Sequence, residues 1–543
     1  MAGGGRVRHG TESYYVVGEG LLSESRGGRA TDADPVEASG SLGEASMAAA
    51  RLAAAPPFHF SRMGPRGAAL AKPLLDKLAR AMTTAGGGAT GIPAGFTYLG
   101  QFIDHDLTFD KTKVMLGEEV TPALLRQARS PSLDLDSLYG AGPQNERSAK
   151  FYADDRHLKT GKTRAVDQDA AHDGFDLPRD RTARRLADRR LALIPEPRND
   201  ENLAVAQTHL AFIRFHNRVV DKLPAGVPAA QRFSRAREKV VKHYQWMIRH
   251  DYLPRICEPQ VLDDVFDNGR KLFEVGAEPT AVPTMPVEFS VAAFRFGHSM
   301  IRSRYDWNRR FPDGEGTLGF LFTFSAGGGD LGGDLVLPSN WICDFRRLYE
   351  FEEAGRDDLV VARTESNRAK RIDSLIVDPL QNLPPGTFGG PEVGFDDPTA
   401  NLAFRNLTRA TMVRLASGQQ MVAHLRDAGV RVRPLSRSQI LNGSGGAVLS
   451  DLTTAQREAL VARTPLWFYV LREAETNDGR LRGVGARILA ETFHRAMEGS
   501  EHSIVRDSTW RPTLGPDDTT FRMVHLLLFA AQNKKRMLNP LGG

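Results

Sequence analysis

Apolar residues recur with helical spacing along most of this chain. Side chains three and four residues apart share one face of a helix, so a stripe with that spacing predicts an amphipathic helix. Such stripes predict helices over residues 202–222, 230–256, 287–302, 400–415, 454–462 and 485–498. Strand signals are short and confined to residues 318–324 and 333–337. The pattern therefore predicts a mainly α fold with few short strands.

The chain divides where large apolar residues begin. Residues 1–55 are rich in Gly, Ser, Ala and Glu and hold few large apolar side chains, which predicts a flexible N-terminal arm. Residues 56–543 read as one large domain. We interpret the glycine-rich stretch 327–334 as a loop, because no strand–turn–helix unit surrounds it as a dinucleotide-binding fingerprint requires.

Charge and cysteine content exclude some classes of function. The 71 Lys and Arg and the 66 Asp and Glu leave a net charge of only +5 over 543 residues, which argues against nucleic acid as the main partner. The Arg-rich stretch 179–190 is interrupted by Asp180 and Asp188 and reads as a solvated helix face. The two cysteines, Cys257 and Cys343, allow one disulfide at most and no Cys-rich zinc site.

The same features bear on location. Few cysteines fit a reducing compartment, or a secreted protein that does not rely on disulfides. The N-terminus lacks the apolar stretch of a signal peptide, and no apolar run is long enough to span a membrane. We therefore expect a cytoplasmic protein, or one exported without a classical signal peptide, with no membrane span.

The densest polar chemistry lies in the segment 98–108. On a helix, Gln101, Asp104 and His105 share one face, and Asp106 points about 100° away from His105. Such a trio beside a separate acid predicts a reactive pocket next to a metal site. A buried hydrogen-bonded network is the alternative interpretation.

Two further clusters carry oxygen or charge at regular spacing. The segment 130–140 places Ser130, Ser132, Asp134 and Asp136 alternately along an extended loop, as a hard cation such as Ca²⁺ prefers, although a polar turn has the same pattern. The segment 195–202 places Arg198 and Glu201 one turn apart at the start of a long helix. Helix capping and an ion pair would explain that spacing equally well.

A histidine in an apolar helix completes the set. His298 lies on the stripe of the predicted helix 287–302, where a core histidine with satisfied hydrogen bonds is the usual reason for its presence. Its neighbour Gly297 lacks a side chain, so a flat ligand could approach closely. Asn406 and Arg409 share a face of another helix, and Asn406 could accept a hydrogen bond from an imidazole and orient it.

Taken together, the clusters resemble the animal-type haem peroxidase superfamily, which includes cyclooxygenase-like enzymes. The motifs GQFIDHDLT, LDLDSLYG, RNDEN…HLAFIRFHNR, FRFGHSMI and RNLTR occur in the family's order between Phe58 and Phe493. The resemblance implies one large haem-peroxidase domain with haem b buried between central helices. The segment after Asn406 lacks the Arg-Asp-His-Gly-Leu-Pro run of mammalian members, and their disulfides are absent, which indicates a bacterial-type branch.

The resemblance also implies roles for individual residues. His298 would be the proximal ligand of the haem iron, with Asn406 on its other ring nitrogen. His105 would be the distal base, Arg198 would stabilise negative charge on the leaving oxygen, and Gln101 would place water or halide. The other implied positions are the ester-forming carboxylates Asp104 and Glu201, the propionate partners Arg295 and Arg409, and the calcium site Asp106, Ser130, Ser132, Asp134 and Asp136. Asn202 stands where some relatives carry a methionine bonded to haem, so that third link is not expected.

The implied activity is oxidation of organic donors or halides by H₂O₂ through a ferryl intermediate, in keeping with a response to oxidative stress. A fatty-acid dioxygenase or cyclooxygenase-like enzyme is one alternative. Cyclooxygenase carries a radical-forming tyrosine three residues before its proximal histidine, whereas this chain has Arg295 there. A non-catalytic haem-binding or adhesion protein is the other alternative, although His105 and Arg198 are both present.

Overall fold

The computed structural model describes residues 58–383, except residues 85, 111, 113 and 115, and residues 397–543. It also gives the backbone of two short antiparallel strands, β1 (Tyr14–Val16) and β2 (Gly20–Leu22). Apart from these strands, the predicted N-terminal arm lies outside the described residues.

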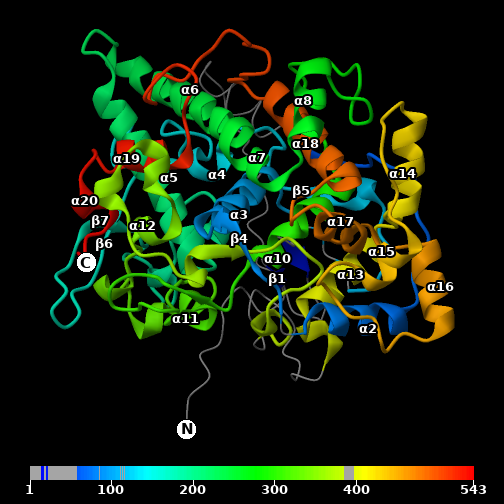
Figure 1. Cartoon of the computed structure of the whole chain (residues 1–543). Helices are drawn as coiled ribbons and strands as arrows, with labels where there is room; N and C mark the ends of the chain where they lie inside the picture. The colour runs from blue at the N-terminus through cyan, green and yellow to red at the C-terminus, as the bar shows by residue number, and fades with distance from the viewer. Residues whose placement is uncertain are drawn as a thin grey trace.

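Helix α3 (Gly95–Leu107) lies at the centre of the molecule (Figure 1). Every residue of α3 is buried except Gln101 and Asp104, which are three residues apart and therefore face the same side. Phe102 anchors the opposite side by stacking on Phe212 of α5 (Leu203–Lys222), with ring centroids 4.4 Å apart. The apolar residues of α3 thus fix the helix in the core and leave its two half-buried side chains, Gln101 and Asp104, facing a cavity.

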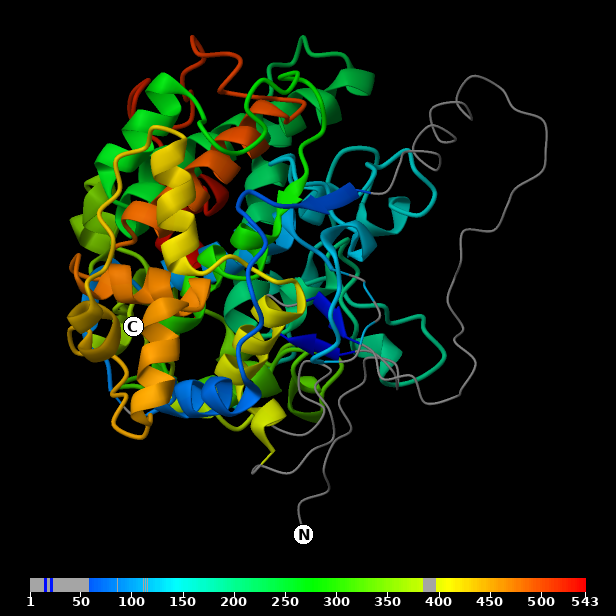
Figure 2. The same cartoon turned by 90° about the vertical axis from the view of Figure 1, so that its right-hand side faces the viewer.

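The other long helices surround α3. Helix α5 packs on α3, on α6 (Ala229–Met247) and on α19 (Met523–Ala530). Helix α18 (Gly483–Glu498) packs on α8 (Pro259–Asn268), α17 (Leu466–Glu475) and α14 (Gly418–Asp427), as Figure 2 shows from the side. Helix α13 (Leu402–Met412) packs on α2 (Lys72–Met82) and α17. The shorter helices are α4 (Asp136–Tyr139), α7 (Leu253–Ile256), α12 (Phe345–Leu348), α15 (Arg437–Asn442), α16 (Thr454–Ala462) and α20 (Lys535–Leu538).

The described strands are short and form small separate sheets. The three-stranded sheet has the order β5–β3–β8, with β3 antiparallel to β5 and parallel to β8. The remaining pairs are antiparallel: β4 with β11, β6 with β7, and β9 with β10. Their bounds are β3 (Phe58–Ser61), β4 (Ala89–Pro93), β5 (Arg126–Gln127), β6 (Gly161–Lys162), β7 (Asp173–Asp176), β8 (Met285–Pro286), β9 (Arg304–Tyr305), β10 (Gly316–Thr317) and β11 (Arg368–Lys370). The prediction of a mainly α fold with few short strands is confirmed.

Most predicted helices are present. The patterns at 202–222, 400–415, 454–462 and 485–498 correspond to α5, α13, α16 and α18. The pattern at 230–256 corresponds to α6, a π-helical turn η5 (Ile248–Tyr252) and α7, which follow one another without a break. Long apolar stripes therefore located these helices to within a few residues.

The prediction of one continuous helix over 287–302 is wrong. This segment folds as α9 (Val287–Ser290), a 3₁₀ turn η6 (Ala293–Phe296) and α10 (Gly297–Met300). The break lies at Ala292, whose φ of −135° and ψ of −72° are not helical. It lets the rings of Phe289 and Phe294 stack with centroids 4.6 Å apart. Residues five apart point in different directions on a continuous helix, so this stacking requires the break.

Both predicted strands are also wrong. Residues 318–323 form helix α11 (Leu318–Thr323), because the Thr317 side chain caps its first turn by accepting from the Phe320 N–H. Residues 333–337 form no strand; a 3₁₀ turn, η7 (Leu331–Gly333), leads into irregular chain. The apolar side chains of this region pack as a cluster around Trp341, which stacks on Phe311 and Phe324.

The glycine-rich stretch is a loop, as predicted, and it packs against another backbone. A Cβ on Gly328 would lie 2.1 Å from the carbonyl oxygen of Glu201, and one on Gly327 would lie 2.8 Å from that of Asp200. The Gly327 N–H donates to Asp200 O at 2.8 Å, and the Ser325 hydroxyl donates to Glu201 O at 2.9 Å. Only glycine allows this approach, so the loop supports the backbone of Asp200 and Glu201.

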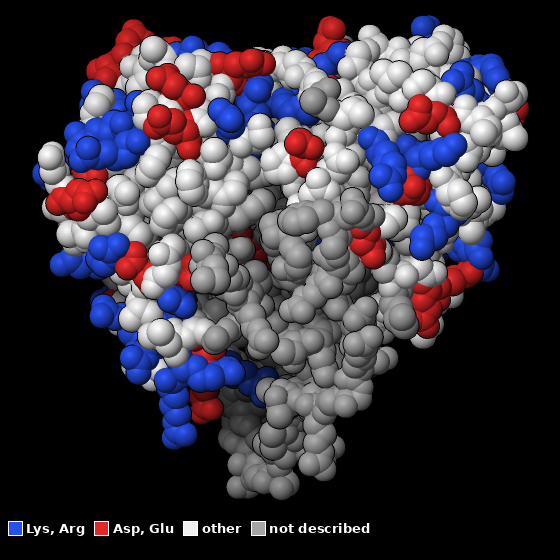
Figure 3. Space-filling model, turned by 90° about the horizontal axis from the view of Figure 1, so that it is seen from below, with Lys and Arg blue, Asp and Glu red and all other residues white. Residues whose placement is uncertain are grey.

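The charged side chains on the surface reflect the nearly equal numbers of basic and acidic residues. Basic and acidic side chains are interspersed on the face shown in Figure 3. Within the part of the chain that the structure describes, no helix combines the length and apolar character needed to cross a membrane.

Gly328→Ala should destabilise the fold by about 1–3 kcal/mol, because the added methyl group must displace the Glu201 backbone. Gly319→Ala is the matched control: Gly319 is exposed in α11, and a Cβ there would meet only the Thr317 hydroxyl at 3.9 Å. That control should be neutral or slightly stabilising, since alanine favours helix. Denaturant unfolding measures both variants. Equal unfolding midpoints for Gly328→Ala and the wild-type chain would contradict the close packing.

Candidate active site

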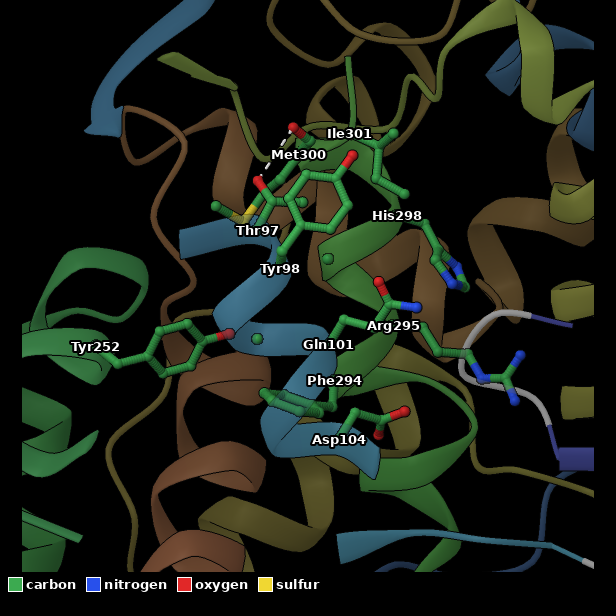
Figure 4. Close-up of a pocket in the computed structure, with 12 residues that line it drawn as sticks. Thr97, Tyr98, Gln101, Asp104, Tyr252, Phe294, Arg295, His298, Met300 and Ile301 are labelled. Atoms are coloured by element: carbon green, nitrogen blue, oxygen red, sulfur yellow. Dashed lines mark hydrogen bonds between the residues drawn. The ribbon is translucent and has the colours of Figure 1, made fainter. Parts of the chain in front are cut away.

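A cavity that opens to solvent lies between α3 and the segment η6–α10. Tyr98, Gln101 and Asp104 line it from α3, and Arg295 and His298 line it from the other wall. Figure 4 shows the side chains of Gln101, Asp104, Arg295 and His298 pointing to the same side. Two motifs that are almost 200 residues apart in the sequence therefore contribute to one site.

His298, Asn406 and Arg295 form a buried hydrogen-bonded chain. Asn406 Nδ2 donates to His298 Nδ1 at 2.9 Å, and the Arg295 guanidinium donates to Asn406 Oδ1. The contact between His298 and Asn406 is the expected one, but its direction is not. We expected Asn406 to accept from the imidazole, whereas its oxygen is already taken by Arg295, which can only donate. An imidazole that accepts at Nδ1 carries its proton on Nε2.

The backbone beside His298 is open. A Cβ built on Gly297 meets no described atom within 4 Å, and Gly297 lines the cavity next to His298. The absence of a side chain leaves room for a flat group against this turn, as the sequence indicated.

His105 is completely buried and lies behind the cavity wall rather than among the residues that line it. Its Nδ1 lies 2.8 Å from Asn199 Oδ1, which can only accept, so Nδ1 carries the proton. Its Nε2 has no hydrogen-bond partner among the described residues. Burial, and then the positive charge of Arg198, lower the pKa of His105 to about 3. His105 is therefore neutral with a free lone pair on Nε2, as a general base at rest must be.

Arg198 is held by a buried carboxylate that the sequence analysis missed. Glu196 accepts from Arg198 Nε at 2.9 Å and Nη2 at 2.8 Å, and from Arg129 Nη2 at 2.5 Å. Burial alone would raise the pKa of Glu196, but the charges of Arg198 and Arg129 and their hydrogen bonds bring it well below its usual range. Arg198 Nη2 also donates to the carbonyl of His105, and Nη1 has no partner among the described residues. The guanidinium is thus fixed beside His105, and its Nη1 remains available to donate a hydrogen bond.

Asn202 links the start of α5 to α3. Its Oδ1 caps α5 by accepting from the Val205 N–H at 2.9 Å, and its Nδ2 donates to Gln101 Oε1 at the same distance. Gln101 Nε2 is left without a described partner. The residue that replaces the methionine of some relatives therefore fixes the Gln101 side chain.

The two carboxylates expected to bond to haem lie in the same electrostatic environment. Glu201 is fully buried, and neither of its oxygens has a partner among the described residues. Burial, offset in part by Arg198, raises the pKa of Glu201 to about 8 and that of Asp104 to about 6. Two carboxyl groups that resist ionisation, close to each other, fit a site that receives another group.

These features fit a haem. Haem needs a histidine, an open flat face, carboxylates that can approach its methyl groups and basic partners for its propionates. His298, Gly297, Asp104 and Arg295 line one cavity, and Glu201 is buried within electrostatic range of Asp104 without lining that cavity. Arg409, the other expected propionate partner, forms an ion pair with Asp110.

The expected calcium residues gather where α3 meets the loop before α4. Asp106 accepts from the Ser137 hydroxyl at 2.7 Å, and Asp134 accepts from the Ser500 hydroxyl at 2.6 Å. Asp136 lies 3.6 Å from Arg237. Ser132 donates to Gly499 O, and the hydroxyl of Ser130 accepts from the Ser132 N–H. Over the described ranges, no three His, Cys, Asp or Glu side chains converge as a metal site, so calcium stays a prediction.

Glu196→Gln should lower the free energy of unfolding by about 3–5 kcal/mol, because it leaves two buried guanidiniums without their counter-charge. The pKa of Glu196 is lowered in the folded state, so its stabilisation is present above the ordinary pKa of a glutamate. That stabilisation is lost as the pH falls through the lower folded value. The difference in the free energy of unfolding between the wild-type chain and Glu196→Gln should therefore be largest at neutral pH and smaller in acid. Denaturant titrations at several pH values measure it, and a gap independent of pH would contradict the pairing.

Comparisons with known proteins identify peroxidases that are similar to parts of this chain. A peroxidase-like protein of Margaritifera margaritifera is 32% identical over 112 residues, which is 20% of this chain and 14% of that protein. Thyroid peroxidase of Canis lupus familiaris is 29% identical over 188 residues, 31% of this chain and 18% of that protein. The matched stretches thus span less than a fifth of these relatives.

Solved structures share the fold over most of the chain. Peroxidase A of Dictyostelium discoideum gives a TM-score of 0.52 at 16% identity, covering 89% of this chain and 94% of its own. A fatty acid α-dioxygenase of Arabidopsis thaliana gives 0.53 at 12% identity, covering 89% and 78%. A sequence model described as animal haem peroxidase matches residues 116–402, more than half of the chain. The chain therefore belongs to the animal haem peroxidase family.

Proposed function

We propose that this protein is a haem-dependent peroxidase that uses H₂O₂ to oxidise a small organic donor or a halide. The observation that carries the proposal is the pair of histidines. His298 lines the cavity, and His105 is buried behind it as a neutral base with a free Nε2. A haem enzyme that activates peroxide needs both an iron ligand and a base.

His298 would hold the haem iron through Nε2, and the bound haem supplies the redox chemistry. Ligation requires the imidazole proton on Nδ1 and an acceptor facing it. The Asn406 oxygen is that acceptor once Arg295 releases it, and the propionate role implied for Arg295 gives the guanidinium another anion to pair with. The residues therefore fit haem once the side-chain amide of Asn406 turns so that its oxygen faces His298.

His105 transfers one proton in the proposed reaction. His105 Nε2 takes a proton from H₂O₂ and returns it to the oxygen that leaves as water. Arg198, held by Glu196, keeps its positive charge beside this base and stabilises negative charge on the leaving oxygen. Gln101, fixed by Asn202, orients water or halide.

Three finer assignments belong to the same proposal. In this proposal Asp104 and Glu201 form ester links with haem, Ca²⁺ binds at Asp106 and the 130–136 loop, and the chain belongs to a bacterial-type branch. We also propose a cytoplasmic location, or export without a classical signal peptide. Both cysteines are free and buried.

The alternative activity is a fatty-acid dioxygenase, since such an enzyme shares the fold. Against it, Arg295 occupies the position of the cyclooxygenase radical tyrosine, and its neighbours are Phe294 and Phe296. Oxygen consumption on adding a fatty acid, without H₂O₂, would favour this alternative.

Substituting the two histidines should separate their roles. His298→Ala should abolish the Soret band, because the iron loses its ligand. His105→Ala should keep the band but slow its change after one equivalent of H₂O₂ by about 10²-fold or more. His59, exposed on β3, serves as the control in His59→Ala, which should match the wild-type chain. Full turnover by His298→Ala, or an unchanged peroxide reaction in His105→Ala, would refute the respective assignment.

Removing calcium tests the second site. EDTA should lower the thermal midpoint, and Ca²⁺ at about 100 times its Kd should restore about 2.7 kcal/mol of stability. Asp134→Ala should abolish this response, whereas Asp173→Ala, at an exposed position, should keep it. Identical melting with EDTA and with Ca²⁺ would refute the site.

A further inference from the structure

Two buried histidines are joined through a single side chain. Asn199 lies in the 3₁₀ turn η4 (Pro197–Asp200), between His105 of α3 and His209 of α5. Its Oδ1 lies 2.8 Å from His105 Nδ1, and its Nδ2 lies 2.9 Å from His209 Nδ1. All three side chains are completely buried.

A primary amide has one end that only accepts and one end that only donates. The oxygen facing His105 therefore requires a proton on His105 Nδ1, which leaves its Nε2 unprotonated. The nitrogen facing His209 requires a lone pair on His209 Nδ1, which places its proton on Nε2. The amide thus imposes opposite tautomers on the two imidazoles.

The surroundings keep the arrangement in place. Both imidazoles are completely removed from solvent, which disfavours their charged forms. Neither Nε2 has a partner among the described residues, so Asn199 alone selects the tautomers. The Asn199 backbone N–H donates to Glu196 O at 3.0 Å, which ties the amide to the residue that holds Arg198.

We infer that Asn199 and His209 are positioning residues that act through His105, holding its Nε2 lone pair free to accept a proton. This inference rests on the proposed function, because it names what prepares the distal base. His209 does not line the cavity, so its effect on the reaction would pass through the Asn199 amide.

The consequence is a dependence of chemistry on a residue outside the cavity. Without an acceptor at the His209 position, the Asn199 amide is free to turn over and donate to His105. His105 then carries its proton on Nε2 and no longer acts as a base. When His105 adopts the wrong tautomer, proton transfer should become slower while haem binding stays intact.

Four variants isolate the chain of contacts. Asn199→Leu removes both hydrogen bonds, and His209→Leu removes only the far acceptor. His209→Asn keeps an amide oxygen near the position of the imidazole Nδ1 and should restore function. His216→Leu is the matched control, because His216 is equally buried on α5 but bonds to Tyr139 and the Arg156 carbonyl instead.

Cyanide binding gives a readout without turnover. HCN must lose its proton to bind haem iron as an anion, so the association rate followed at the Soret band reports the distal base. We expect Asn199→Leu to slow cyanide binding and the peroxide reaction by about 10-fold or more. His209→Leu should follow in the same direction, while His209→Asn and His216→Leu should stay within about 3-fold of wild type. Wild-type rates in Asn199→Leu or His209→Leu with normal haem content would overturn the inference.

The tautomers can be observed directly. Full-length protein with ¹⁵N-labelled histidine rings, with any bound haem as the diamagnetic ferrous carbonyl form, should show His105 protonated at Nδ1 and His209 at Nε2. The His105→Ala and His209→Asn spectra assign the signals. The same tautomer in both rings, or the reverse pair, would overturn the inference. A wild-type chain without a Soret band would refute the proposed function instead, and the tautomer measurement would still decide on Asn199.

Discussion

The site depends on one buried carboxylate. Glu196 lies between Arg198 and Arg129 and is completely removed from solvent. Two guanidiniums around one carboxylate leave a positive charge in the core, which is costly unless every group is held in a defined geometry. That geometry fixes η4 against the end of α3, since Arg198 also donates to the carbonyls of His105 and Thr108. The distal side of the proposed reaction is therefore organised by a residue that does not line the cavity.

A second constraint comes from backbone contacts behind η4. Gly327, Gly328 and Ser325 lie directly against the carbonyls of Asp200 and Glu201. Asn202 then caps α5 and holds Gln101. The segment 196–202 is thus fixed by ion pairs on one side, by backbone contacts on another and by a helix cap at its end. This explains how a short irregular stretch can place several reactive side chains without belonging to a long helix.

Sequence patterns predicted the helices better than the site. Apolar stripes such as that of α5 follow burial, and burial decides which helices form. The segment around His298 was expected to be one helix, because periodicity does not register the break at Ala292 that allows Phe289 to stack on Phe294. The candidate residues came largely from motifs, whereas Glu196, Asn199 and His209 were missed. A histidine inside the almost entirely buried stretch 203–213 was the available signal, because a buried polar group needs a partner, but the sequence does not show which partner it finds.

The chain from Arg295 through Asn406 to His298 has a consequence for selectivity. While Arg295 holds the amide oxygen, the His298 Nε2 bears a proton and offers no lone pair to a bare metal ion. A free Zn²⁺ or Ni²⁺ carries no anionic group that would draw the guanidinium away from Asn406. Haem brings carboxylates together with its iron, and these can draw Arg295 away and release the amide. Under the proposed function, this chain of hydrogen bonds makes His298 a better ligand for a metal that arrives with its own anions than for a bare ion.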